Sequence, residues 1–174
     1  MTRSNIKLGR DFFCRDVLEV APDILGKVLV RRFYDGHLFK SRITEVEAYR
    51  GEEDRACHAC RGRTSRTEIM YQPGGYIYVY LIYGMHWMLN FVTGGGNEPQ
   101  ALLVRGLADI SGPGRITRSL KIGSDFYGED LTASDRLWIE AGDRQVKMQA
   151  GPRIGIDYAG EPWKTVPWRY VAIS

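Results

Sequence analysis

The chain has 174 residues, 44% of them hydrophobic and 26% charged, and its 24 basic and 21 acidic residues give a formal net charge of +3. This composition is ordinary for a globular domain and excludes a largely disordered chain. The absence of any run of about 20 apolar residues excludes a helical membrane protein, and the odd count of three cysteines excludes a closed disulfide framework.

The first predicted element is a short helix over residues 16–25. Asp16 can cap its N-terminus, and Gly26 can end it. Pro22 lacks the backbone N–H that a helix interior uses, so we expect it to split this helix.

A β-hairpin is predicted next. Residues 27–34 are rich in strand formers, Asp35-Gly36 suits a two-residue type I′ turn, and residues 37–49 return. Residues 50–72 are polar and aperiodic, which predicts a long loop of the kind that often carries function.

The second half alternates short strands and one helix. Strand formers at 76–89 predict a strand with a bend or tip at Gly84. A helix over 113–122 is expected to end at Gly123. Further strands are predicted at 100–107, 136–140, 153–156 and 168–173. Because no strand–helix–strand rhythm appears, we expect an α+β fold: a single domain, 1–174, with a curved, largely antiparallel sheet and short helices around it.

A carboxylate beside an aromatic ring is the first chemical feature. In an extended strand Ile43, Glu45, Glu47 and Tyr49 share one face, which puts Glu47 and Tyr49 side by side. Such a pair suits a site that stacks a planar ring and activates a water. An edge strand with its charged side in solvent is the simpler alternative for this segment alone.

The segment from Asp54 to Arg66 has two interpretations. Cys57, His58 and Cys60 resemble zinc ligands, but no spaced second pair supplies a fourth ligand, so we expect no metal and no cofactor. The same segment is rich in arginine and suits phosphate binding, although a solvated charged loop is equally compatible with its composition; the arginines are Arg55, Arg61, Arg63 and Arg66.

Tyrosines dominate the strand that follows. Tyr76, Tyr78 and Tyr80 share one face, and most such side chains are core residues. Near a basic loop they also suit base stacking. The tip Tyr83-Gly84-Met85 could present an apolar wedge.

Several short motifs occur in order from about residue 6 to 173: Glu45–Tyr49 with Gly51, Asp54 and His58; Pro73-Gly74; Tyr78–Met85 with Asn90; Leu103–Arg105; Gly112–Gly114; and Arg153–Glu161. As an ordered set they resemble the alkyladenine (3-methyladenine) DNA glycosylase family, the monofunctional type without a helix-hairpin-helix or a metal. The resemblance implies a base-excision repair enzyme that flips alkylated or deaminated purines, such as 3-methyladenine and hypoxanthine, out of duplex DNA and hydrolyses the N-glycosidic bond.

The resemblance also implies roles for individual residues. Glu47 matches the carboxylate that activates the water, and Arg105 and the backbone carbonyl of Ile154 match its two further contacts. Tyr83 matches the side chain that fills the gap in the duplex. The residues matching the wall of the base pocket are Tyr49, His58, Tyr80 and Asn90, and Asn90 matches the one that crowds the amino group of guanine.

The expected partner is therefore duplex DNA that contains damaged purines, with no membrane partner, and the chain is expected to be a monomer. The first ten residues lack the apolar region of a secretory signal, which predicts a cytoplasmic protein, associated with the nucleoid if the source is bacterial. A non-catalytic nucleic-acid binding module, or a hydrolase that modifies RNA or nucleotides, remains the alternative.

Overall fold

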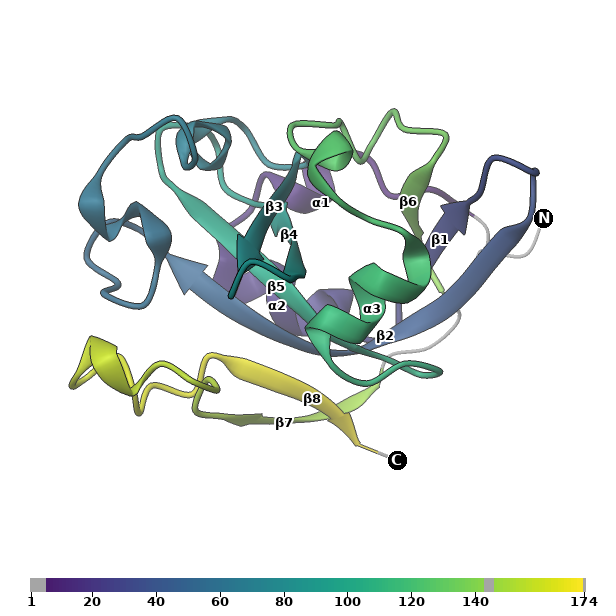
Figure 1. Ribbon diagram of the computed structural model, residues 1–174. Coiled ribbons are helices and arrows are strands. Elements are labelled where there is room, and N and C mark those ends of the chain that lie inside the picture. Colours follow the sequence, from purple (N-terminus) through teal and green to yellow (C-terminus); the bar gives the residue numbers. More distant parts are fainter. Residues whose placement is uncertain (1–5, 143–145, 174) are drawn as a thin grey trace.

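A computed structural model describes residues 6–142 and 146–173 and shows one strongly curled sheet with short helices around it (Figure 1). The helices are α1 (Arg10–Phe13), α2 (Val17–Ile24) and α3 (Pro113–Leu120), with 3-10 turns η2 (His58–Arg61), η3 (Glu68–Tyr71), η4 (Ser124–Phe126) and η5 (Asp157–Ala159). The strands are β1 (Val28–Arg32), β2 (Leu38–Arg50), β3 (Ile77–Ile82), β4 (His86–Val92), β5 (Gln100–Leu107), β6 (Leu137–Glu140), β7 (Lys147–Gly151) and β8 (Arg169–Ile173). The predicted α+β class with a curved antiparallel sheet is confirmed.

The long strand β2 is the axis of the sheet. The strand order is β3-β4-β5-β2-β1-β6, and the β7–β8 pair joins through β8 to β2. All the strand pairs are antiparallel. Residues Leu38–Arg42 of β2 pair with β1, and Glu45–Glu47 pair with both β5 and β8. The C-terminal half of β2 is thus flanked by strands from distant parts of the chain.

The register between β2 and β5 is irregular. Ile43 pairs with Leu107 and Glu45 with Gly106, which leaves Thr44 as an extra residue on β2. Val46 then pairs with Val104, which leaves Arg105 as an extra residue on β5. A bulge of this kind re-aims a side chain. It also overturns the predicted shared face of Ile43 and Glu47, because Ile43 lies in the hydrophobic core together with Val46 and Ala48.

The main core lies between the sheet and the helices that pack on it. α2 contacts β2 and β5, and α3 contacts β4 and β5. The buried residues of α2 have the spacing of one helical face: Val17, Val20, Ala21 and Ile24. Pro22 does not split α2, which contradicts the sequence prediction; burial of that face stabilises the turn that Pro22 weakens. Among the described residues, no helix is long and apolar enough to span a bilayer.

Three other local predictions were wrong. Of the predicted turn pair Asp35-Gly36 only Gly36 has a positive φ, of 85°, and five residues connect β1 to β2. α3 ends with Lys121 in the left-handed region, before Gly123. Residues 153–156 form no strand; Gly155 has a φ of 71°, and the segment forms a loop that leads into η5.

Candidate active site

The carboxylate of Glu47 is fully buried where β2 is flanked by β5 and β8. Its Oε1 accepts a hydrogen bond from the backbone N–H of Ile154 at 2.7 Å, and its Oε2 accepts one from the Tyr49 hydroxyl at 2.7 Å. The second bond places the side chains of Glu47 and Tyr49 on one face of β2, as the strand pattern predicted. Because an unpaired buried carboxylate is strongly unfavourable, the two donors both offset its burial and fix its orientation.

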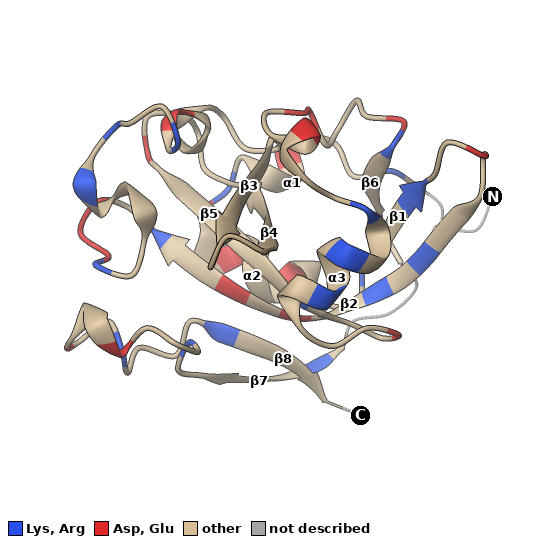
Figure 2. Cartoon of the chain, in the orientation of Figure 1, with Lys and Arg blue, Asp and Glu red and all other residues tan. Residues whose placement is uncertain are grey.

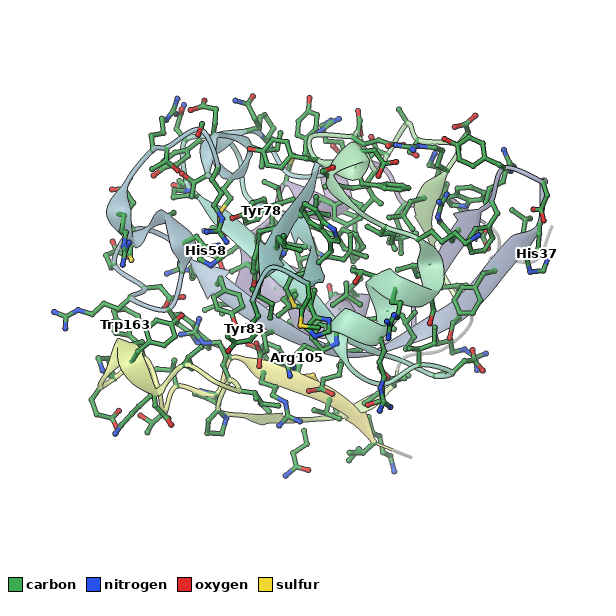
Figure 3. The ribbon with its side chains drawn as sticks, in the orientation of Figure 1. His37, His58, Tyr78, Tyr83, Arg105 and Trp163 are labelled. Carbon is green, nitrogen blue, oxygen red and sulfur yellow. The ribbon has the colours of Figure 1, made fainter. Side chains whose placement is uncertain are left out.

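Arg105 is brought to Glu47 by the bulge in β5. Its Nε lies 3.6 Å from Glu47 Oε1 and 3.4 Å from Glu45 Oε1. Glu45 Oε1 also accepts a hydrogen bond from Arg169 Nε at 2.7 Å. The side chains of Glu47, Arg105, Glu45 and Arg169 therefore form a row in which carboxylates and guanidinium groups alternate. Figure 3 shows Arg105 below the centre of the molecule.

An inner cavity of about 50 Å³ is lined by Tyr49, whose hydroxyl donates to Glu47. Its walls include Tyr49, His58, Tyr78, Tyr80, Asn90 and Tyr158. The rings of His58 and Tyr80 contact edge to face, with centroids 4.4 Å apart. A volume of this size holds only one or two water molecules. This space alone is therefore smaller than a purine base.

His58 is held in its uncharged form. Its Nδ1 and the Tyr78 hydroxyl share a hydrogen bond of 2.8 Å. Burial, followed by the positive charges of Arg66 and Arg61, lowers the pKa of His58 to about 4. Burial also raises the pKa of Tyr78 to about 12. At neutral pH the inner cavity is thus lined here by an uncharged imidazole and an uncharged phenol.

The lowered pKa of His58 predicts a specific loss of stability in acid. Between pH 6.5 and about 4 the unfolded chain binds a proton at His58 that the folded chain does not, so falling pH favours unfolding. Wild type should lose up to about 1.4 kcal/mol of unfolding free energy per pH unit more than His58→Gln in this window. Urea denaturation at several pH values measures the difference.

The matched control for this experiment is His37→Gln. His37 is exposed at the opposite end of the molecule, in the β1–β2 loop (Figure 3). This variant should show the wild-type pH dependence of stability. Equal slopes for wild type and His58→Gln would contradict the assignment of an uncharged, buried His58.

An outer cavity of about 480 Å³ lies next to the inner one and shares His58, Cys57 and Tyr158 with it. Three arginines line it: Arg55, Arg61 and Arg66. Arg63, the third predicted phosphate ligand, does not reach this cavity. Its guanidinium lies over the Tyr71 ring at 4.5 Å and donates hydrogen bonds to Glu68 and Asn97.

The cysteines of the Cys-His-x-Cys segment differ in surroundings. Cys57 is buried, and burial raises the pKa of its thiol to about 12, whereas Cys60 is exposed. Within residues 6–142 and 146–173, no three His, Cys, Asp or Glu side chains are grouped as ligands for a metal ion. The described part of the site therefore offers hydrogen bonding and charge but no metal centre.

A buried ion pair supports the loop that holds Glu47. Arg153 and Asp54 side chains are both fully buried, and Arg153 donates to the two Asp54 oxygens at 2.6 and 2.9 Å. The guanidinium also lies over the rings of Tyr49 and Trp168, at 4.8 and 5.1 Å. Because Arg153 directly precedes Ile154, this pair fixes the backbone N–H that contacts Glu47.

Comparison with known proteins shows to which family the chain belongs. The family model described as methylpurine-DNA glycosylase matches residues 11–111 and 108–173. The chain belongs to the methylpurine-DNA glycosylase family. It is 43% identical to a protein of Methanocella arvoryzae over 94% of this chain and 90% of the relative. It is 40% identical to a protein of Psychrobacter cryohalolentis over 86% and 84%, and 38% identical to one of Desulfitobacterium hafniense over 94% of each chain.

All three relatives are provisionally named 3-methyladenine DNA glycosylase. Family membership makes this chain a DNA glycosylase, an enzyme that hydrolyses N-glycosyl bonds. It therefore decides against the alternative of a non-catalytic binding module.

The glycosylase exposes an aromatic side chain at the β3–β4 tip. Tyr83 is 89% exposed and has a φ of 51°, and Gly84 follows with a φ of 64°. Glycine or asparagine is the usual residue at such a φ, so a tyrosine here is strained. Met85 beside it is also exposed. The fold thus keeps a large aromatic side chain in solvent at a position that disfavours it.

The sequence pattern did not assign Arg66 and Tyr158 to the base pocket of the glycosylase. Arg66 lies over the Tyr80 ring at 5.1 Å, and Tyr158 lines both cavities. Tyr158 belongs to the last motif of the family resemblance, and that motif was the available signal for it. Arg66 could be recognised only as one arginine among several, because its contact depends on how the segment between η2 and η3 approaches β3.

Proposed function

We propose that this DNA glycosylase removes alkylated or deaminated purines, such as 3-methyladenine and hypoxanthine, from duplex DNA by base flipping. Hydrolysis with a water activated by Glu47 would leave an abasic site. The observation that carries the proposal is the buried Glu47 carboxylate, held by Tyr49 and Ile154 beside Arg105 and next to an aromatic cavity.

The proposed chemistry follows from the positions of the charges. Departure of the base leaves positive charge on the sugar, as in other glycosyl hydrolyses. The Glu47 carboxylate can take the proton of the attacking water and offset that charge. We assign the other contacts of this water to Arg105 and the backbone carbonyl of Ile154. Glu47 is 0% exposed, so bulk water does not contact its carboxylate in the free protein.

Base recognition is assigned to the walls of the inner cavity. Aromatic stacking is worth about 1–3 kcal/mol per base, enough to offset much of the cost of flipping. We assign this stacking to Tyr49, His58 and Tyr80. Asn90 is buried, and its Nδ2 donates to the Tyr78 carbonyl at 3.2 Å. We assign to this fixed amide the crowding of a purine that carries an extra amino group.

The proposed DNA surface surrounds the exposed tip. Figure 2 shows basic residues on the loop around η2 and again along α3, on both sides of the β3–β4 hairpin. Arg55 and Arg61 lie on the first side, and Arg115 and Arg118 on the second. A duplex that lies across the β3–β4 hairpin would contact basic side chains on both sides of the hairpin. Its affinity for the protein should therefore fall as the salt concentration rises.

A base-release assay tests the proposed function. The protein is incubated with duplexes that carry one hypoxanthine or one 3-methyladenine, and with an undamaged duplex. We expect free damaged base by mass spectrometry and strand breaks only after alkali, because none of the described residues that line the inner cavity is a lysine able to form a Schiff base. Release from RNA or free nucleotides but not from damaged DNA would favour the alternative hydrolase.

Tyr83→Ala tests the role of the hairpin tip. The side chain should act only where a flipped base leaves a gap, so affinity for lesion duplex should fall roughly tenfold while affinity for undamaged duplex changes little. Fluorescence anisotropy with both duplexes measures this. Tyr34→Ala is the matched control, because Tyr34 is 99% exposed at the tip of the other hairpin. Equal losses on both duplexes would argue against insertion of Tyr83.

A further inference from the structure

We propose that Glu45 and Arg169 are positioning residues for catalysis: they hold Arg105 midway between two carboxylates and so keep Glu47 available to the water. The proposal rests on the proposed role of Glu47 and extends it to residues outside the base pocket. Its basis is the geometry of the four charged side chains.

Arg105 Nε lies close to two carboxylate oxygens but forms a hydrogen bond with neither of them. It lies 3.4 Å from Glu45 Oε1 and 3.6 Å from Glu47 Oε1. Charge-assisted N–H···O bonds measure about 2.7–2.9 Å. This Nε is buried, and among the described residues it has no hydrogen-bond partner. The guanidinium is therefore held between the carboxylates at nearly equal distances.

Arg169 explains why Arg105 does not bind Glu45 more tightly. Its Nε donates to the same oxygen, Glu45 Oε1, at 2.7 Å. Arg169 pairs with Glu47 across β8 and β2, and its side chain reaches diagonally to Glu45. Because Glu45 is already engaged by Arg169, its attraction for Arg105 is balanced by that of Glu47.

The backbone makes this arrangement possible at one place only in β5. The extra residue at Arg105 turns its side chain toward β2, and the following residue, Gly106, lets the strands approach closely. A Cβ on Gly106 would lie 2.9 Å from Thr44 Oγ1 and 3.0 Å from Glu45 Cβ. The close approach of the two bulged segments thus sets the distance between Glu45 and Arg105.

Loss of either positioning residue should disturb the balance. Without the Arg169 cation, Glu45 would draw Arg105 into a full hydrogen bond and away from Glu47. Without the Glu45 charge, Arg105 would close on Glu47 Oε1, which already accepts the Ile154 N–H, and would engage the carboxylate that the water needs. Both changes should slow base release without weakening DNA binding.

The experiment measures the chemical step and binding separately. Single-turnover base release at saturating enzyme and the Kd for lesion duplex are determined for Glu45→Gln, Arg169→Gln and the double variant. Each single variant should release base about tenfold more slowly, with an unchanged Kd. The double variant should match Glu45→Gln, because Arg169 acts only through Glu45.

Two further variants distinguish a loss of the positioning contacts from a general disturbance of the structure. Asp23→Asn removes the exposed Arg15–Asp23 ion pair and should release base at the wild-type rate. Arg169→Lys keeps a cation beside Glu45 and should recover the rate to within about threefold of wild type.

The outcomes that overturn the proposal are distinct. A wild-type rate for Arg169→Gln would overturn it, and so would a double variant whose loss is the product of the single losses. A weaker Kd with an unchanged rate would make Arg169 a DNA contact instead. Glu47→Gln is measured alongside: if it still releases base, the proposed role of Glu47 has failed, whereas an inactive Glu47→Gln beside a fully active Arg169→Gln refutes only the positioning.

Discussion

Glu47→Gln should bind lesion duplex with nearly wild-type affinity and release almost no base. Glutamine has the shape of glutamate and can still accept the hydrogen bond that Ile154 donates. It cannot take a proton from water or offset the positive charge that develops on the sugar. Loss of general base catalysis alone should lower single-turnover release by about 10²–10⁴, and loss of the electrostatic contribution adds to it.

Glu19→Gln is the control for this substitution, because Glu19 is an exposed residue of α2. It should release base at the wild-type rate. Thermal unfolding of both variants shows whether the Glu47 substitution leaves the fold intact. Release of hypoxanthine by Glu47→Gln within tenfold of wild type would show that another group activates the water.

The largest effect on stability is expected for Arg153→Met. The substitution removes a fully buried guanidinium and leaves the Asp54 carboxylate buried without its partner. Breaking a buried ion pair in this way destabilises a protein by about 3–5 kcal/mol. Base release should fall as well, since the loop that presents Ile154 to Glu47 loses its anchor. Urea denaturation measures the change in unfolding free energy.

The exposed pair of Arg15 and Asp23 gives the matched comparison. Arg15→Met removes one partner of a solvent-exposed ion pair and should change stability by no more than about 1 kcal/mol. A similar small effect of Arg153→Met would mean that water enters the space around Asp54 and solvates it.

Local patterns predicted much of the sheet. Strand formers over 76–89 predicted one strand with a bend or tip at Gly84, where the structure has the two strands β3 and β4. Burial of Ile77 and Val79 opposite the cavity-lining Tyr78 and Tyr80 agrees with the predicted alternation. Sequence patterns gave wrong predictions where contacts between distant segments determine the backbone conformation. The segment 153–156 has the composition of a strand but turns at Gly155. β7 has mostly exposed residues and owes its conformation to pairing with β8.

Site residues could be named from motifs, but their arrangement could not. Glu47 and Tyr49 lie together because residues two positions apart on a strand share one face, and this spacing is visible in the sequence. The contacts of Glu45 with Arg105 and Arg169 depend on a bulge on each of two strands and on a third strand from the C-terminal region. Register shifts of this kind leave no periodic signal in a sequence, because each changes the pairing by a single residue.

A structure of Glu47→Gln bound to a duplex that contains one hypoxanthine is the most direct test of the account. We expect the damaged base between Tyr49, His58 and Tyr80, with Tyr83 in the gap of the duplex. One water should lie within hydrogen-bond distance of the side chain at position 47 and face the sugar carbon of the glycosidic bond. A base that stays stacked in the duplex, or a sugar carbon on the far side of the cavity from position 47, would contradict the account.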